Sequence, residues 1–311
     1  IENWYGRTGN NIQQCAVGIL IAIKKKNKFE TISSEIIKPF KLDFGKSLEN
    51  IKTSFFWYGN YDSPNIPTFK VYKDIFNICQ KYIIKNLGVS SVKLSDKTLV
   101  IHIRSGDIFR GKGAHSDYVQ NPYIYYLHLI ELYEEVIVVT QSDEKNPILK
   151  KLRKNPKVKI QSKSISEDFA TLIAAKNLAT SGVGTFAIGA AMCSRNLQNL
   201  YCSNKILRRH LNYHMLSNTN INIYICELKK YINIGDWTNC RSQRDLMINY
   251  KGIINFKKYR KNNFNLIFIS LLTDVELIIM QSKNNFLSYL KRSRKVIKKK
   301  LKKMKEKIFT Q

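Results

Sequence analysis

The stretch LVIHIRSGDIF at residues 99–109 decides the expected fold of this chain. It begins as an unbroken apolar run, which is typical of a strand buried in a parallel sheet. It then turns into Arg104, Gly106 and Asp107. In α/β proteins, ligands bind outside the carboxyl ends of such strands. The stretch therefore predicts a central strand over 98–104 that places Arg104 at the ligand-binding edge of the sheet.

Strand-like and helix-like runs alternate after this stretch. The strand-like runs lie at 135–142, 157–161, 178–182 and, as the last one, 199–203. The helix-like runs between them lie at 121–134, 146–154, 166–178 and 184–195. A strand and a helix in turn indicate βαβ units on a parallel sheet. We therefore expect a Rossmann-type domain over residues 96–252.

The first 95 residues have a similar but shorter pattern. Apolar periodicity predicts helices over 12–23 and 72–87, and short apolar runs predict strands at 29–33 and 54–59. Residues 1–95 are therefore expected to form a smaller α/β domain.

The net charge of +29 is concentrated near one end of the chain, because residues 253–311 hold 16 basic and 3 acidic side chains. We expect 253–311 to be a separable basic tail. Within it, apolar residues at helical spacing predict a basic amphipathic helix, and its basic run 291–307 favours an anionic membrane surface as partner. A plain solvated helix is the alternative. Nucleic acid is disfavoured, because no aromatic residue interleaves the run.

The same tail contains the most apolar stretch of the chain, 264–280. Asp274 and Glu276 lie within it, so a membrane span is not expected.

Metal-binding and redox patterns are weak in this sequence. There is no Cys-x-x-Cys pair and no Asp-x-Asp, so no metal or cofactor is expected beyond a substrate. His210 and His214 are spaced like metal ligands, but they lack an acidic or thiol partner and suit a surface helix better.

Three segments could build one anion site. The first is YGRTGNN (5–11), whose Gly9 permits a tight turn and whose Asn10 or Asn11 could cap the following helix. The second is HIRSGD (102–107), and the third is the Ser-Gly-x-Gly-Thr turn, where Ser181 and Thr185 precede a helix. The first two have structural alternatives: a simple capped turn for the first, and a core histidine at His102 or an ion pair between Arg104 and Asp107 for the second.

These segments resemble the fucosyltransferase superfamily, which includes α-1,2-, α-1,6- and protein O-fucosyltransferases. HIRSGD is similar to the family peptide His-x-Arg-Arg-Gly-Asp, and GRTGNN to its Gly-x-x-Gly-Asn-Gln loop. SEDFATLIAAKNLATSGVGTFAIGAAM (166–192) is similar to its third region. The resemblance implies a GT-B-like fold of two Rossmann-type domains, with 1–95 on the acceptor side. It also implies a metal-independent, inverting transfer of fucose from GDP-fucose to a glycan or protein hydroxyl.

The resemblance also implies roles for single residues. Arg104 matches the arginine that binds the donor β-phosphate, and His102 matches a histidine near the nucleotide. Asn10 matches an asparagine that faces the cleft, and Thr185 and Phe186 match the turn under the nucleotide.

Three positions depart from the family pattern. Ser105 replaces an arginine, Asn11 replaces a glutamine, and Asn177 stands where some relatives use an aspartate to read guanine. The donor could therefore be another nucleotide sugar.

The catalytic base is open between three carboxylates, Asp107, Asp62 and Asp117. A degenerate transferase fold that binds membrane or nucleic acid through its tail is the remaining alternative.

Overall fold

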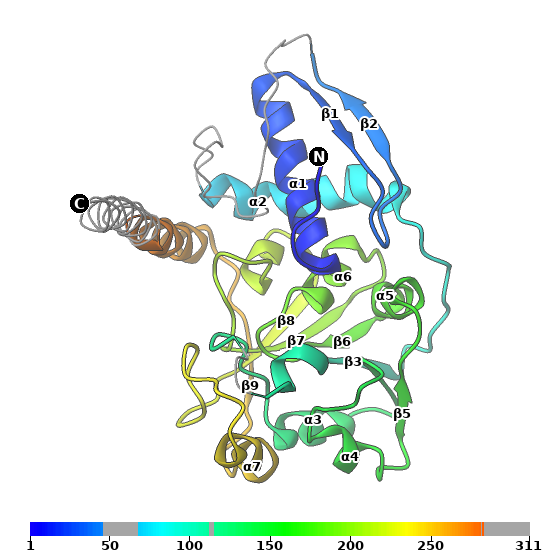
Figure 1. The fold of residues 1–311 in the computed structure, drawn as a ribbon, viewed down its shortest axis with the longest axis vertical. Coiled ribbons are helices and arrows are strands. Elements are labelled where there is room, and N and C mark those ends of the chain that lie inside the picture. Colours follow the sequence, from blue (N-terminus) through cyan, green and yellow to red (C-terminus); the bar gives the residue numbers. More distant parts are fainter. Residues whose placement is uncertain (46–67, 112–114, 281, 283–311) are drawn as a thin grey trace, which may run out of the picture.

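The computed structural model describes residues 1–45, 68–111, 115–280 and 282. Its described residues contain a seven-stranded sheet in the order β5-β4-β3-β6-β7-β8-β9, with helices on both faces (Figure 1). Every neighbouring pair is parallel except β8 and β9. The strands are β3 (Thr98–Ile103), β4 (Glu135–Thr140), β5 (Val158–Gln161), β6 (Asn177–Ala179), β7 (Asn199–Ser203), β8 (Asn222–Cys226) and β9 (Phe256–Lys258). The expected α/β class with a mostly parallel sheet is confirmed.

Strand β3 is central, as its apolar run predicts, and all six of its residues are buried. From β3 the chain proceeds to β4 and β5 on one side, and then crosses to β6 on the other side of β3. The gap between β3 and β6 is therefore the point where the direction of strand order reverses. In open α/β sheets this is where ligands bind, at the carboxyl ends of the strands.

The helices cover the sheet in two layers. One face packs against α5 (Ile165–Ala174) and α6 (Phe186–Cys193), and the other against α3 (Tyr123–Ile130), α4 (Leu149–Leu152) and α7 (Arg241–Asn249) (Figure 1). Alternate residues of β3 serve the two layers, with Val100 in one core and Leu99 and Ile101 in the other. The period of two in a strand accounts for this division.

The N-terminal part adds a further layer above α6. It consists of α1 (Thr8–Lys25), the hairpin strands β1 (Lys28–Thr31) and β2 (Phe40–Asp43), and α2 (Thr68–Ile78), which continues through a π turn at Cys79–Ile83 and a 3-10 turn at Ile84–Asn86. The expected helices and the strand at 29–33 are confirmed. The strand expected at 54–59 lies outside the described residues.

Within the described residues, this N-terminal part does not hold a parallel sheet of its own. Its two strands pair antiparallel. Its apolar side chains, such as Ile12 and Ile75, join one core with Ala190 and Met192 of α6. The expected second Rossmann-type unit is thus, as far as it is described, a helical layer with a hairpin, and its core continues into the larger domain.

The sheet continues past the expected last strand at 199–203 and past residue 252, the expected end of the Rossmann-type domain. β8 extends the sheet after the expected last strand, and β9 pairs antiparallel with β8, so that Tyr224 faces Lys258. The helix Asn263–Met280 then returns to α2, where Tyr72 and Thr273 hydroxyls lie 3.1 Å apart. The described part of 253–311 is therefore joined to the fold. The basic run 291–307 lies outside the described residues.

Helix Asn263–Met280 is long and apolar enough to cross a membrane by length and composition, and 17% of it is buried. This is weak support for a span, because core helices meet the same criterion.

His210 and His214 correct the expectation of a surface helix. Both are buried, in a loop and in a 3-10 turn (Tyr213–Leu216). His214 Nδ1 lies 2.8 Å from the Tyr259 hydroxyl, and this contact satisfies it in the interior. For His214, packing against Tyr259 in the segment after β9 buries a side chain that the local pattern places at the surface.

Candidate functional site

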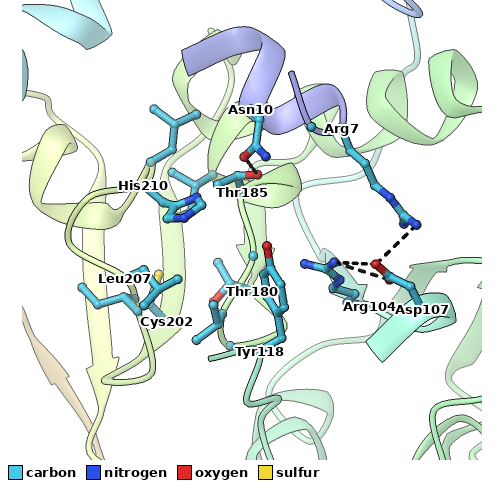
Figure 2. A pocket seen from close by; sticks show the side chains of 17 residues that line it. Arg7, Asn10, Arg104, Asp107, Tyr118, Thr180, Thr185, Cys202, Leu207 and His210 are labelled. Carbon is cyan, nitrogen blue, oxygen red and sulfur yellow. Dashed lines mark hydrogen bonds and ion pairs between the residues drawn. The ribbon is translucent and has the colours of Figure 1, made fainter. Parts of the chain in front are cut away.

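A cavity of about 250 Å³ lies at the carboxyl ends of β3, β6 and β7, below the start of α1 (Figure 2). Its walls come from four parts of the chain that are distant in sequence. It is lined by Gly6, Arg7, Asn10, Arg104, Asp107, Tyr118, Thr180, Gly182, Val183, Gly184, Thr185, Ile188, Cys202, Ile206, Leu207, His210 and Leu211. The cavity thus occupies the position where the strand order reverses, and it contains residues of all three predicted segments.

Arg104 is held firmly at one side of the cavity. Its guanidinium carbon lies 4.0 Å from the centroid of the Tyr118 ring, and its side chain is 15% exposed. Its backbone carbonyl accepts a 2.9 Å hydrogen bond from Asn146. Gly106, two residues on, turns the chain with a φ of +74°, which favours glycine. The group is therefore oriented before any ligand arrives.

Asp107 lies between two guanidinium groups. Arg104 Nη2 is 3.3 Å from Asp107 Oδ2, and Arg7 Nη2 is 3.6 Å from the same oxygen (Figure 2). Arg7 extends from the start of α1 and is 60% exposed. The ion pair between Arg104 and Asp107, an alternative in the sequence analysis, is therefore present, and a second cation joins it.

Ser105, which replaces the second arginine of the family peptide, does not face the cavity. It is fully buried, and its hydroxyl accepts a 3.0 Å hydrogen bond from the Asn146 amide. Arg7 instead supplies a second cation, from a different segment. No role is predicted for Arg7 from the sequence, although a basic residue in the glycine-flanked loop GRTGNN is a signal for anion binding.

The start of α6 forms the opposite wall. Thr185 Oγ1 donates a 2.9 Å hydrogen bond to Asn10 Oδ1, which links the α1 and α6 ends (Figure 2). The N-cap residue of α1 is Arg7 and that of α6 is Thr185. Neither of these makes a side-chain hydrogen bond that caps its helix. The first amides of α6 lack partners within the helix and carry its positive dipole end. This wall favours an anion.

His102, Ser181 and Phe186, which are expected to bind the donor, do not line the cavity but lie behind the residues that do. The His102 ring packs 5.2 Å from the Phe186 ring, and His102 Nδ1 lies 3.3 Å from Ser181 Oγ. Burial, and secondarily the charge of Arg104, lower the pKa of His102 from 6.5 to about 3. His102 is therefore neutral at pH 7. Together with Ser181 and Phe186 it packs beneath the lining residues of the cavity.

Gly9 and Asn177 lie away from the lining. A Cβ on Gly9 would come within 2.4 Å of the Thr185 backbone, so Gly9 serves the close approach of α1 to α6. Asn177 lies at the amino end of β6 and donates hydrogen bonds to the carbonyls of Asp96 and Thr98. Its place at the far edge of the sheet argues against the expected role in donor binding.

The structure describes two of the three candidate bases, Asp107 and Asp117. Asp117 does not line the cavity and pairs with Arg209 at 2.8 Å. Asp62 lies outside the described residues. Asp107 lines the cavity and is 46% exposed.

The remaining wall is apolar apart from one histidine. Its members are Ile188, Cys202, Ile206, Leu207, His210 and Leu211. Burial is the main cause that lowers the pKa of His210 to about 3, so the imidazole is neutral at pH 7. His210 was noted in the sequence only for its spacing from His214, and the apolar residues of loop 204–211 carry no local signal for a site; this loop reaches the cavity because it follows β7.

Within the described residues, no group of three or more His, Cys, Asp or Glu side chains could hold a metal ion. Comparisons of the chain with protein-family models, curated proteins and solved structures found no match.

Proposed function

We propose that this chain is a glycosyltransferase that binds the diphosphate of a nucleotide sugar in this cavity. The observation that carries the proposal is the convergence of Arg104, Arg7 and the α6 N-terminus on one cavity at the reversal point of the sheet. Guanidinium forks and helix N-termini both suit phosphate oxygens. The motif resemblance supports GDP-fucose as the donor and a glycan or protein hydroxyl as the acceptor.

The proposed donor site is built from two parts of the chain, although the N-terminal part, where it is described, is a helical layer with a hairpin and not a Rossmann-type domain. The N-terminal layer supplies Gly6, Arg7 and Asn10 to a cavity whose other walls belong to the sheet domain. A donor bound there would lie between the two parts, as in a two-lobed transferase.

In the proposed reaction, the acceptor oxygen attacks the anomeric carbon from the face opposite GDP. The bond from that carbon to the β-phosphate oxygen breaks, and its electron pair leaves with GDP. Arg104 and Arg7 would stabilise the negative charge that develops on the β-phosphate. No metal is required for this step in the proposal.

Asp107 is the proposed base. In the structure its carboxylate contacts both arginines. A diphosphate would take over those guanidinium contacts, and the carboxylate would then be free to accept the acceptor's proton. The configuration at the anomeric carbon inverts.

Calorimetric titration of GDP and UDP in EDTA tests the proposal. We expect GDP to bind, UDP to bind much more weakly, and Arg104→Ala to lose roughly 10- to 100-fold in GDP affinity, as for a charge-assisted hydrogen bond. Arg241→Ala is the matched control, because Arg241 is 91% exposed on α7, remote from the cavity. Absence of GDP binding by folded wild type, or equal binding by Arg104→Ala, would contradict the proposal.

A further inference from the structure

Helix Asn263–Met280 presents an unusually apolar outer face. Eight of its described large apolar side chains are 36–77% exposed. They are Phe264, Ile267, Phe268, Leu271, Leu272, Val275, Ile278 and Ile279. They recur about one turn apart and form a continuous stripe along the helix, which is drawn in orange in Figure 1. Monomeric soluble proteins rarely expose so large an apolar patch without a binding role.

The opposite face of the same helix is fastened to the protein. Leu266, Ser270 and Thr273 are at most 2% exposed. The Thr68 hydroxyl donates to Asp274, and Arg209 Nη1 lies 2.7 Å from Glu276 Oε1. The two acidic residues of the helix therefore point to the protein, and they leave the outer stripe without a charge.

This one-sided attachment argues against a helix surrounded by lipid. A spanning helix would have to release the Glu276 pair and the buried Thr273, and it would carry two carboxylates into the hydrocarbon. A helix that lies in the membrane interface keeps its inner contacts and buries only its outer stripe.

The basic residues on both sides of the stripe favour a negatively charged lipid surface. At the amino end, Lys257, Lys258 and Arg260 are exposed. After the helix, residues 283–311 contain twelve lysines and arginines and one glutamate. Anionic headgroups attract such flanks, whereas a second copy of a chain with net charge +29 would be repelled.

We propose that the outer stripe of helix Asn263–Met280 docks on an anionic lipid bilayer, with the helix parallel to the membrane. This proposal does not depend on the nucleotide site. It places the membrane contact on the helix itself, in addition to the basic run that follows it.

Sedimentation of the full chain with vesicles tests the proposal. The vesicles are pure phosphatidylcholine, or phosphatidylcholine with about 30% phosphatidylserine. We expect binding to the anionic vesicles and release by alkaline carbonate. A variant with Leu271→Glu and Val275→Glu should bind the anionic vesicles with an affinity lower by about tenfold or more. Leu132→Glu with Ile165→Glu is the matched control, because both residues are exposed aliphatics on other elements. Thermal unfolding checks that both variants are folded.

Four outcomes would overturn the proposal. The first is failure of wild type to sediment with the vesicles. The second is binding of the Leu271 and Val275 variant at the wild-type level, which would leave the basic run alone responsible. Resistance to carbonate would indicate a spanning helix. A wild-type dimer that the same two substitutions dissociate would identify a second copy as the occupant.

Discussion

At the scale of single residues, the Asp107 carboxylate occupies the two arginines that the proposed diphosphate would bind. Its carboxylate contacts Arg104 and Arg7 at 3.3 and 3.6 Å, distances longer than those of an ideal charge-assisted hydrogen bond. The aspartate is also 46% exposed, so water screens both pairs. These contacts therefore hold the arginines in place without binding them tightly, and a diphosphate with two charges would displace the carboxylate.

The substitution Asp107→Asn tests this competition. The asparagine keeps the size of the side chain but removes the negative charge that competes for the arginines. We expect GDP affinity to rise by about threefold to tenfold, measured by calorimetry, which corresponds to roughly 1 kcal/mol. Asp245→Asn, at an exposed pair on α7, should leave the affinity unchanged. A weaker affinity in Asp107→Asn would instead mean that the carboxylate positions Arg104 for the ligand.

At the scale of elements, the close approach of α1 to α6 builds one wall of the cavity. Gly9 of α1 meets both Thr185 and Gly189 of α6, and a Cβ on Gly189 would lie 3.3 Å from the Gly9 Cα. Two glycines at the crossing let the backbones come close. The same approach brings Asn10 to Thr185, and so the two helix ends share one wall.

Gly9→Ala should therefore push the two helices apart. The added methyl would lie 2.4 Å from the Thr185 backbone, which has no flexible end that could move aside. We expect a loss of about 3 kcal/mol in the free energy of unfolding, measured by denaturant titration, together with weaker GDP binding. In Gly88→Ala the nearest atom is 3.5 Å away, an ordinary contact, and the loss should stay within about 0.5 kcal/mol. Equal stability of the two variants would show that α1 and α6 can separate freely.

At the scale of the whole molecule, burial of uncharged histidines links stability to pH. Burial lowers the pKa of His102 and His210 to about 3 and that of His214 to about 4, from 6.5. Below pH 6.5 the unfolded chain binds protons that the folded chain does not. The contribution of these histidines is therefore fully present above pH 6.5 and is lost as the pH falls towards 4.

Thermal unfolding between pH 7.5 and 4.5 checks this dependence. Each histidine can add up to about 1.4 kcal/mol per pH unit to the slope, so we expect a marked fall in melting temperature below about pH 6. His214→Gln should flatten the curve, whereas His115→Gln, at a side chain that is 62% exposed, should leave its shape unchanged. A melting temperature that is constant down to pH 5 would show that the buried histidines are protonated in the folded state.

Three features could be predicted from the sequence alone: the central strand, the alternation of strands and helices, and the position of Arg104 at a strand end. These features depend on local periodicity, which survives in any tertiary context. Asn10, Asp107 and Thr185 were also found in this way, because each belongs to a segment that opens or closes an element.

Which of these residues lie together depends on how the elements pack. The packing of α1 on α6 brings Arg7 to the cavity of Arg104, and the place of β7 in the sheet brings His210 there. Asn177 lies at the amino end of β6 and therefore at the other edge of the sheet. Likewise, β9 and helix Asn263–Met280 belong to the fold through pairing with β8 and contact with α2. Such contacts join residues far apart in sequence, and no local pattern specifies them.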